Sequence, residues 1–518
     1  MKDLQVKNDE PPPTNTGVDP SVLNPIWESI WALRPVLKEI MEKKGGKSLF
    51  EYALDFYDVN PCPGLDDRKE ELIEVAQQIL EERLGKQVAE EVAQQLRRLP
   101  LVATSDHHGP VVSTFFVNSN IMMGLHHGFT GKDYQYLVAF SFATVSLNNV
   151  SYPRGVLFYG NEDSSDSLIR LSLMTDKEKM GAVYHMRAYT VEDVNRAKQV
   201  LRDRVKAGQV SKEKAERVEA ILDRYFGSEA VLSSRNFCEQ ATRINYELWP
   251  ALFPASDKKV PDLIYLDIET LITRLLLELH FKRPDSLVYR MLFDPKFQEA
   301  ILRHFEGIPG GFSVEKDWGT YLFWGLDEKN HRSRLALKDG KLTSATGEWA
   351  FDFTSEGIKQ ALEEERIFPS MLLCYLIVAF YYGFKCLGGF SQVSDLTHTK
   401  EAWMAMLKEL GEEAEAEAVI PVQTKELNDG LTLAYLRTNQ WNFIPANALD
   451  LILQGGVSFE DFVSLAKSLS FKEMMNPLVL EIYKVLYPED KRDPAYMALT
   501  TEKLMELSGL KAKLSELA

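Results

Sequence analysis

Residues 99–128, LPLVATSDHHGPVVSTFFVNSNIMMGLHHG, decide the fold that the sequence predicts. The apolar run Leu99–Thr104 has the composition of a short buried strand, and the polar turn Ser105–Gly109 follows it. Pro110 then opens an apolar stretch of helical length, Val111–Leu125. A strand, a tight turn and a helix in this order are typical of the ligand-binding edge of an α/β sheet, because backbone N–H groups at the start of a helix favour anions.

Length and composition limit the class of protein. A chain of 518 residues is too long for one hydrophobic core, so two or three domains are expected. The net charge of −17 argues against nucleic acid as a partner. The four cysteines (62, 238, 374 and 386) show no CxxC spacing and indicate free thiols in a reducing cytoplasm.

The N-terminal residues lack the apolar stretch of a signal peptide, and the longest apolar run, Met371–Phe384, is too short to span a bilayer. We therefore expect a cytoplasmic protein with a small-molecule substrate and no membrane partner; oligomer formation stays open.

Apolar periodicity and turn residues divide the chain into six regions. We expect a disordered arm (1–20), a helical N-terminal region (21–98), a Rossmann-like α/β core (99–304) containing a charged helical hairpin (191–225), a small antiparallel β insert (305–352), a return to the core (353–425) and a helical C-terminal region (426–518). Within these regions we predict buried strands at Tyr134–Leu147 and Asp262–Leu266, shorter ones at Arg154–Phe158 and Leu168–Leu173, and an acidic linker at Glu412–Glu417.

The turn after the first strand carries the candidate catalytic residues Asp106, His107 and His108. A carboxylate beside histidines can exchange protons, polarise a carbonyl or bind phosphate. The turn residues expected to bind the substrate or a nucleotide are Thr104, Ser105 and Gly109. The same pattern is also compatible with a turn in which the aspartate only caps the backbone.

A metal site is the alternative for this turn. Adjacent histidines point in different directions, so metal ligands have to come from further along the chain. The alternative ligand set is Asp106, His108, His126 and His127.

Two later turns provide further candidate binding residues. Asn148 and Asn149 follow a buried strand and suit a ribose or a carbonyl group, while Arg154 suits a phosphate or a carboxylate. Gly388 and Gly389 follow the apolar run 371–384, where a glycine pair lets the backbone approach a ligand, and Gln392 comes directly after them. The two asparagines and Arg154 are expected beside the first turn, on the same parallel sheet.

The order of these features resembles the cysteine-adding ligase family of bacillithiol biosynthesis. The family's first motif, Thr-Gly-Gln-Gln-X-Gly, corresponds to residues 104–109, where Thr104 and Gly109 match. Its second motif, Ala-Ser/Thr-Glu-Asp-His-Asp, corresponds to Ala143-Thr144 and the residues after them, which lack the acidic and histidine set. A later Gly-Gly-Pro-Gly-Glu motif corresponds to residues 388–392, with Gln392 in place of the glutamate. The resemblance covers roughly residues 95–460 and rests on order more than on identical residues.

The resemblance implies a nucleotidyltransferase-type Rossmann core and a ligase- or transferase-like enzyme that forms carbon–nitrogen bonds. Such an enzyme would bind a nucleotide, an amino-acid-type substrate or both in the cleft between the three turns. The cofactor is left open between ATP or another nucleotide and a divalent metal. Two alternatives stand beside this hypothesis: a metal-dependent hydrolase that uses the Asp-His-His-Gly turn, and a non-catalytic small-molecule-binding protein on an inherited enzyme fold.

Overall fold

A computed structural model describes residues 20–127, 134–161, 167–344, 347–437 and 442–517. The disordered arm predicted for residues 1–20 lies outside these ranges except for its last residue. The predicted helical N-terminal region is confirmed. Its helices are α1 (Asn24–Leu33), α2 (Pro35–Lys44), α3 (Leu49–Leu54), α4 (Pro63–Asp66), α5 (Lys69–Leu84) and α6 (Lys86–Arg98).

Four parallel strands form the central sheet, in the order β13-β1-β2-β5. The strands are β1 (Leu101–Ala103), β2 (Tyr136–Ser141), β5 (Asp262–Asp267) and β13 (Lys385–Leu387). The prediction of an α/β protein with a parallel sheet is therefore confirmed. The strand predicted at Tyr134–Leu147 is shorter than expected, because after Ser141 the backbone of Phe142 bonds to the loop that follows β1 instead of to β5.

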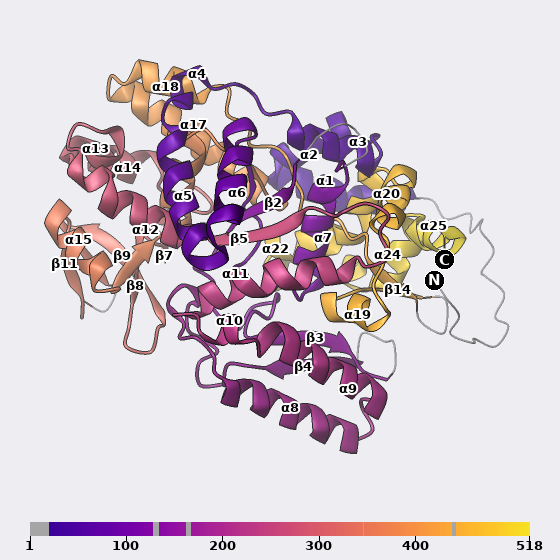
Figure 1. Cartoon of the computed structure of the whole chain (residues 1–518). Coiled ribbons are helices and arrows are strands. Elements are labelled where there is room, and N and C mark those ends of the chain that lie inside the picture. The colour runs from indigo at the N-terminus through magenta and orange to yellow at the C-terminus, as the bar shows by residue number, and fades with distance from the viewer. Residues whose placement is uncertain (1–19, 128–133, 162–166, 345–346, 438–441, 518) are drawn as a thin grey trace.

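Both faces of this sheet are buried, and successive residues of each strand contribute to different cores. In β2, Leu137 and Ala139 belong to the core that contains α7 (Thr114–Gly124) and α11 (Phe237–Leu248). Tyr136, Val138 and Phe140 belong to the core that contains α5, α6 and α12 (Ile268–Glu278). Figure 1 shows α5 and α6 on one side of β5 and α11 on the other. Burial on both faces explains why the strands are almost continuously apolar.

Between β2 and β5 the chain forms a separate layer. Strands β3 (Gly155–Tyr159) and β4 (Leu168–Ser172) pair with each other as a hairpin and not with the parallel sheet. Helices α8 (Val191–Lys206) and α9 (Lys212–Ile221) form the predicted charged hairpin, which begins with a capping box of Thr190 and Asp193. The short helix α10 (Glu229–Leu232) leads into α11.

The predicted β insert is an antiparallel sheet with the order β11-β10-β9-β8-β12. It follows α13 (Leu287–Phe293) and α14 (Pro295–His304). Its strands are β8 (Phe323–Leu326), β9 (Arg332–Lys338), β10 (Lys341–Ser344), β11 (Ala350–Asp352) and β12 (Ile367–Pro369), and a short hairpin, β6 (Phe312–Ser313) with β7 (Trp318–Gly319), precedes them. Strand β12 comes after α15 (Ser355–Glu363), so the sheet uses residues beyond the predicted boundary at 352.

After the insert, the chain returns to the parallel sheet through α16 (Met371–Tyr375) and a π-helical segment, Leu376–Tyr381, both buried. Helix α17 (Gln392–Glu409) follows β13. The acidic linker predicted at Glu412–Glu417 is wrong: these residues belong largely to helix α18 (Glu413–Val419), which packs against α17 and α4. Its Ala416 and Val419 are buried, so the acidic residues occupy only the outer face.

The C-terminal region is helical as predicted, after a small hairpin. Its elements are β14 (Tyr435–Arg437), β15 (Phe443–Pro445), α19 (Ala448–Leu453), α20 (Phe459–Ser468), α21 (Phe471–Met475), α22 (Val479–Leu486), α23 (Pro494–Met497), α24 (Thr501–Leu507) and α25 (Leu510–Leu517). None of the helices in the described part of the chain combines the length and the apolar character needed to cross a membrane.

We predict that Gln95→Ala lowers the free energy of unfolding by about 3 kcal/mol. The buried amide of Gln95 on α6 accepts from the backbone N–H groups of Gln135 and Tyr136 and donates to the Tyr136 carbonyl, so the substitution leaves two buried backbone groups of Tyr136 and the part-buried N–H of Gln135 without this partner. Urea denaturation measures the loss. Gln87→Ala on the exposed face of the same helix is the control and should change stability by less than about 0.5 kcal/mol. Equal losses in the two variants would contradict this role of Gln95.

Candidate functional site

The carboxyl ends of the four parallel strands lie at one edge of the sheet, and the loops after β1 and β13 meet there. Thr104 N donates to Leu387 O at 2.9 Å, and the Gln392 amide donates to Thr104 Oγ1 at 2.6 Å. Further along the first loop, His108 N donates to Phe142 O at 2.8 Å. The structure therefore brings together two of the turns that the sequence singled out.

The carboxylate of Asp106 is completely buried and accepts hydrogen bonds from four side chains. Ser105 Oγ and Ser119 Oγ each lie 2.9 Å from Oδ1, Asn120 Nδ2 lies 2.8 Å from Oδ2, and the hydroxyl of Tyr265 also donates to Oδ2. Burial raises the pKa of this carboxyl above its ordinary value, although all four hydrogen bonds oppose the rise. Asp106 thus joins the loop after β1 to helix α7 and strand β5.

A third loop, before β14, completes the edge. Its backbone pairs with the glycine turn: Gly388 N donates to Glu426 O at 3.1 Å, and Asn428 N donates to Gly388 O at 2.9 Å. A Cβ atom on Gly389 would lie only 3.2 Å from Asp429 Oδ2, so glycine permits this close approach. We call residues 104–109, 388–392 and 428–429 together the carboxyl-edge site.

Asp429 is the functional candidate that sequence reasoning missed. Burial, together with the negative charge of the neighbouring Asp106, raises the pKa of Asp429 to about 7. Asn428-Asp429-Gly430 is a typical turn sequence. Asp429 lies next to Asp106 only in the folded protein, because more than 300 residues separate the two in the chain. The only local signal was an acidic residue in a turn, which is too common to single out.

Two buried amides, that of Asn428 in this site and that of Asn120 next to Asp106, have an atom without a hydrogen-bond partner in the described part of the chain: Asn120 Oδ1 and Asn428 Nδ2. Both side chains have no exposed surface. Ser105 Oγ lies 2.9 Å from Asp106 and 3.3 Å from Asn428 Oδ1, but a hydroxyl has one proton to donate. Turning the Asn428 amide by 180° lets its nitrogen donate to Ser105, and the oxygen then lacks a partner. In either orientation an unpaired polar atom stays in the site. The half-buried residues of the site are Ser105, His107, Gly389, Phe390, Ser391, Gln392 and Asp429.

His107 lies at the border of the site. Its Nδ1 is 3.3 Å from Asn149 Oδ1, and its ring makes an edge contact with Phe116. Burial lowers the pKa of His107, so the imidazole is neutral at pH 7 and can accept or donate one proton. Asn149 is thus beside the first turn as predicted, whereas Asn148 is exposed.

The segment 148–154 approaches the first turn, but Arg154 does not serve the site. Pro153 lies so close to Gly109 that a Cβ atom there would be 2.6 Å away, which explains the glycine. The Arg154 guanidinium is 2.6 Å from Asp176 and lies over the ring of Tyr152. The prediction that Arg154 binds an anion in the cleft is therefore not supported, because β3 begins at the next residue and leads the chain away from the parallel sheet.

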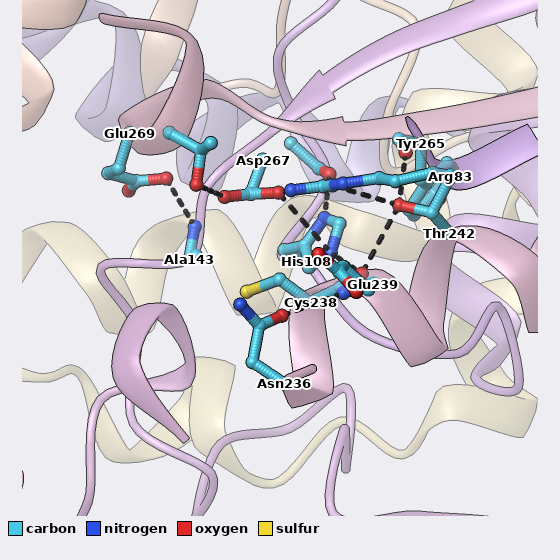
Figure 2. Close-up of polar contacts among 12 residues, drawn as sticks. Arg83, His108, Ala143, Asn236, Cys238, Glu239, Thr242, Tyr265, Asp267 and Glu269 are labelled. Atoms are coloured by element: carbon cyan, nitrogen blue, oxygen red, sulfur yellow. Dashed lines mark hydrogen bonds and ion pairs between the residues drawn. The ribbon is translucent and has the colours of Figure 1, made fainter. Parts of the chain in front are cut away.

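His108 belongs to a separate buried network with Arg83, Cys238 and Asp267 (Figure 2). Its Nδ1 is 2.8 Å from Ser141 Oγ, and its Nε2 is 3.0 Å from the Cys238 carbonyl. Nε2 also lies 4.0 Å from Asp267, whose carboxylate pairs with Arg83 at 2.6 Å. Both ring nitrogens are thus engaged, and burial lowers the pKa of His108. These contacts fit a histidine that holds the loop in place.

His108, Cys238 and Asp267 are also arranged as metal ligands could be. One ligand atom from each lies within 4.8 Å of the others, and all three residues are buried. However, Arg83 already supplies the positive charge that a metal would bring, and it holds the pKa of Asp267 down to about 2 although burial opposes this. Burial raises the pKa of the Cys238 thiol well above its ordinary value, which disfavours the thiolate that binds metals. The residues present do not fit a metal centre.

The other predicted metal ligands do not join this group. The ring of His126 packs at a tilt against that of Phe50, and its Nε2 lies 2.5 Å from the Phe50 carbonyl. His127 packs edge-on against Tyr134. Among the described residues, the ligand set Asp106, His108, His126 and His127 is therefore not brought together.

Comparisons with known proteins do not assign the chain to a family. No protein-family model matches it, and no curated protein has a significant similarity to it.

We predict that Asp429→Asn changes the pH dependence of stability. Between about pH 4 and pH 7 the folded protein keeps the Asp429 proton while the unfolded chain loses it, so the wild type becomes less stable as the pH rises through this range. The asparagine variant lacks this loss. Its free energy of unfolding relative to the wild type should rise by about 2 kcal/mol from pH 5 to pH 8, as measured by urea denaturation. A difference between variant and wild type that is independent of pH would contradict the raised pKa.

Two Arg–Asp ion pairs with the same N···O distance, one buried and one with an exposed aspartate, provide a matched test of the buried network. Asp267→Asn should lower the free energy of unfolding by about 3–5 kcal/mol, because it leaves the Arg83 guanidinium buried without its counter-ion. Asp176→Asn breaks the pair with Arg154, in which the aspartate is 82% exposed, and should change stability far less, because water screens this pair. Chemical denaturation of both variants measures the two losses. A small loss in the first variant would mean that water reaches Arg83.

Proposed function

We propose that this protein is a ligase- or transferase-like enzyme that binds a nucleotide, an amino-acid-type substrate or both on a Rossmann-like core. The observation that carries this proposal is the strand order. Numbered along the chain, β5-β2-β1-β13 is 3-2-1-4, which is the order around the centre of a Rossmann sheet. Ligands of such sheets bind where the order reverses, between the first and the fourth strand. The loops of Asp106 and of Gly388-Gly389 follow those two strands.

The paired carboxylates suit the proton transfer that carbon–nitrogen bond formation needs. An ammonium group has to lose a proton before its nitrogen can attack an acyl or phosphoryl centre. An ordinary aspartate is too weak a base to hold a proton at neutral pH. Asp429, whose pKa is about 7, can accept the proton of the ammonium group and hold it near neutral pH. Asp106 raises the pKa of Asp429 by its charge and is itself held by its four donors. We assign Asp429 as the general base and Asp106 as its partner.

The site also favours particular ligand groups. Asp106, Asp429 and the unpaired oxygen of Asn120 are acceptors, which fit an ammonium group or the hydroxyls of a ribose. The same oxygens suit a hard divalent cation such as Mg²⁺. ATP as the nucleotide, implied by the resemblance to the cysteine-adding ligases, would place its ribose here and would need a cation elsewhere for its phosphates.

We also propose that the enzyme acts in the cytoplasm on a small-molecule substrate. The four cysteines are buried free thiols, which suits a reducing compartment. A nucleic acid is a poor partner for a chain with a net charge of −17.

The test combines ligand binding with turnover. Melting temperatures of the wild type are measured with ATP, ADP, free amino acids and Mg²⁺, and the ligands that raise them are assayed together for release of phosphate, pyrophosphate or AMP. Asp429→Asn should keep the ligand-induced shift and lose at least about 100-fold in turnover, because it removes the base but not the volume. Asp106→Asn should lose both the shift and the turnover.

Asp176→Asn is the control for the removal of a negative charge outside the site, and it should behave as the wild type. Wild-type turnover in both Asp106→Asn and Asp429→Asn would contradict the proposed roles. Binding that depends on Asp106 without turnover in any combination of ligands would favour a non-catalytic binding protein on this fold.

A further inference from the structure

We propose that Arg332, from the antiparallel sheet, binds the oxyanion of the ligand that occupies the carboxyl-edge site, either a carboxylate or a phosphate. This inference rests on the proposed function for the identity of the site, but its evidence is independent. Arg332 then supplies the positive charge that the sequence predicted for Arg154.

Arg332 is the first residue of β9, yet it reaches the parallel sheet. Its Nη1 donates to the carbonyl of Thr144 at 3.1 Å, and Thr144 follows β2 at the carboxyl edge. Thr144 is itself fixed, because its N–H and hydroxyl donate to the buried carboxylate of Glu269. The Arg332 guanidinium lies 4.8 Å from the ring centre of Trp324 on β8. A carbonyl and an aromatic face thus orient the guanidinium without neutralising it.

The segment 182–185 joins the antiparallel sheet to the loop after β2, because Tyr184 N donates to Ala143 O, next to Thr144, at 2.9 Å. Ala182 N donates to Asn330 O at 2.8 Å, and the Asn330 amide donates to His185 O at 2.8 Å. Close by, the rings of Tyr184 and Phe368 stack with centres 5.1 Å apart. The loop before β9 is therefore anchored through Asn330, two residues before Arg332.

Arg332 has a charge without a counter-ion. Within the described part of the chain it forms no ion pair with a carboxylate, and burial alone lowers its pKa from the ordinary value. Its neighbour two residues on, Arg334, differs: it pairs with Asp317 and donates to Ser313 O. An arginine has five N–H donors, and one of those of Arg332 is used. The remaining donors and the partly dehydrated charge match a planar oxyanion.

Arg332 lies near enough to the carboxyl-edge site to share a ligand with it. Its positive charge acts on His107 and helps to lower the pKa of that imidazole, together with burial. The backbone of His107, which directly follows Asp106, pairs with Phe142, two residues before the Thr144 whose carbonyl holds Arg332. A ligand with an ammonium group at Asp106 and Asp429 and an oxyanion at Arg332 would match both ends. Amino acids and phosphorylated amines have this distribution of charge.

The test uses inorganic phosphate and succinate as probes of the two sources of oxyanion. Binding to the wild type is measured by isothermal titration at low ionic strength, and the same titrations are made on Arg332→Gln and Arg334→Gln. At least one probe should bind the wild type. The affinity for that probe should fall at least tenfold in Arg332→Gln, stay within twofold in Arg334→Gln, and be partly restored in Arg332→Lys. Binding of phosphate alone assigns a phosphate, and binding of succinate alone assigns a carboxylate.

Equal affinity in Arg332→Gln and the wild type would overturn the inference, as would no binding of either probe to the wild type. Circular dichroism melts check that each variant is folded, and Arg332→Gln should fold because this side chain is open to solvent on one side. The result of this binding test does not depend on whether the proposed catalytic role of Asp429 is correct. Asp429→Asn leaves Arg332 in place, so it should bind the anion as the wild type does even where it has no turnover.

Discussion

The central sheet has no face open to water, and this constraint organises the rest of the chain. Each of its four strands sends alternate residues into two different cores, so helices have to cover both sides. Parallel neighbours also require long crossover connections, which the chain supplies as α7, as the α8–α11 segment and as the path from α12 to α16. Because all four strands point in one direction, every crossover leaves from the same edge, and the polar loops collect there.

That edge contains two kinds of buried polar group with different physical roles. In one network, Arg83 and Asp267 neutralise each other, and His108 is bonded through both ring nitrogens; such a network fixes loops and has little chemistry left to offer. In the other, Asp106 and Asp429 repel each other, and two amide atoms have no hydrogen-bond partner among the residues that the structure describes. Like charges held together and unpaired polar atoms cost folding free energy, and ligand binding is the usual way in which such a cost is offset.

The antiparallel sheet connects this edge to a second source of charge. Its attachment through Asn330 places Arg332 beside Thr144, while Arg334, two residues further along the same strand, meets an acidic partner. The two arginines have the same local sequence pattern, and only their surroundings in the folded protein distinguish them. Arg154 illustrates the converse, since it lies in a turn of the expected type and is neutralised by Asp176.

The sequence by itself determined the parallel sheet, the order strand–turn–helix after Leu99 and the turn at residues 388–392, because apolar runs and glycine turns are local patterns. The start of the helix was predicted wrongly, since α7 begins at Thr114 and not after Pro110. It could not show that α18 is a helix, since alternating Glu and Ala hide two buried positions in an acidic segment. Only the tertiary structure brought Asp429 to Asp106 and Arg332 to Thr144, because segments far apart in the chain meet through the order of strands and the docking of one sheet on another. Both the charge of a side chain and its freedom to bind a ligand depend on those neighbours, which no local pattern contains.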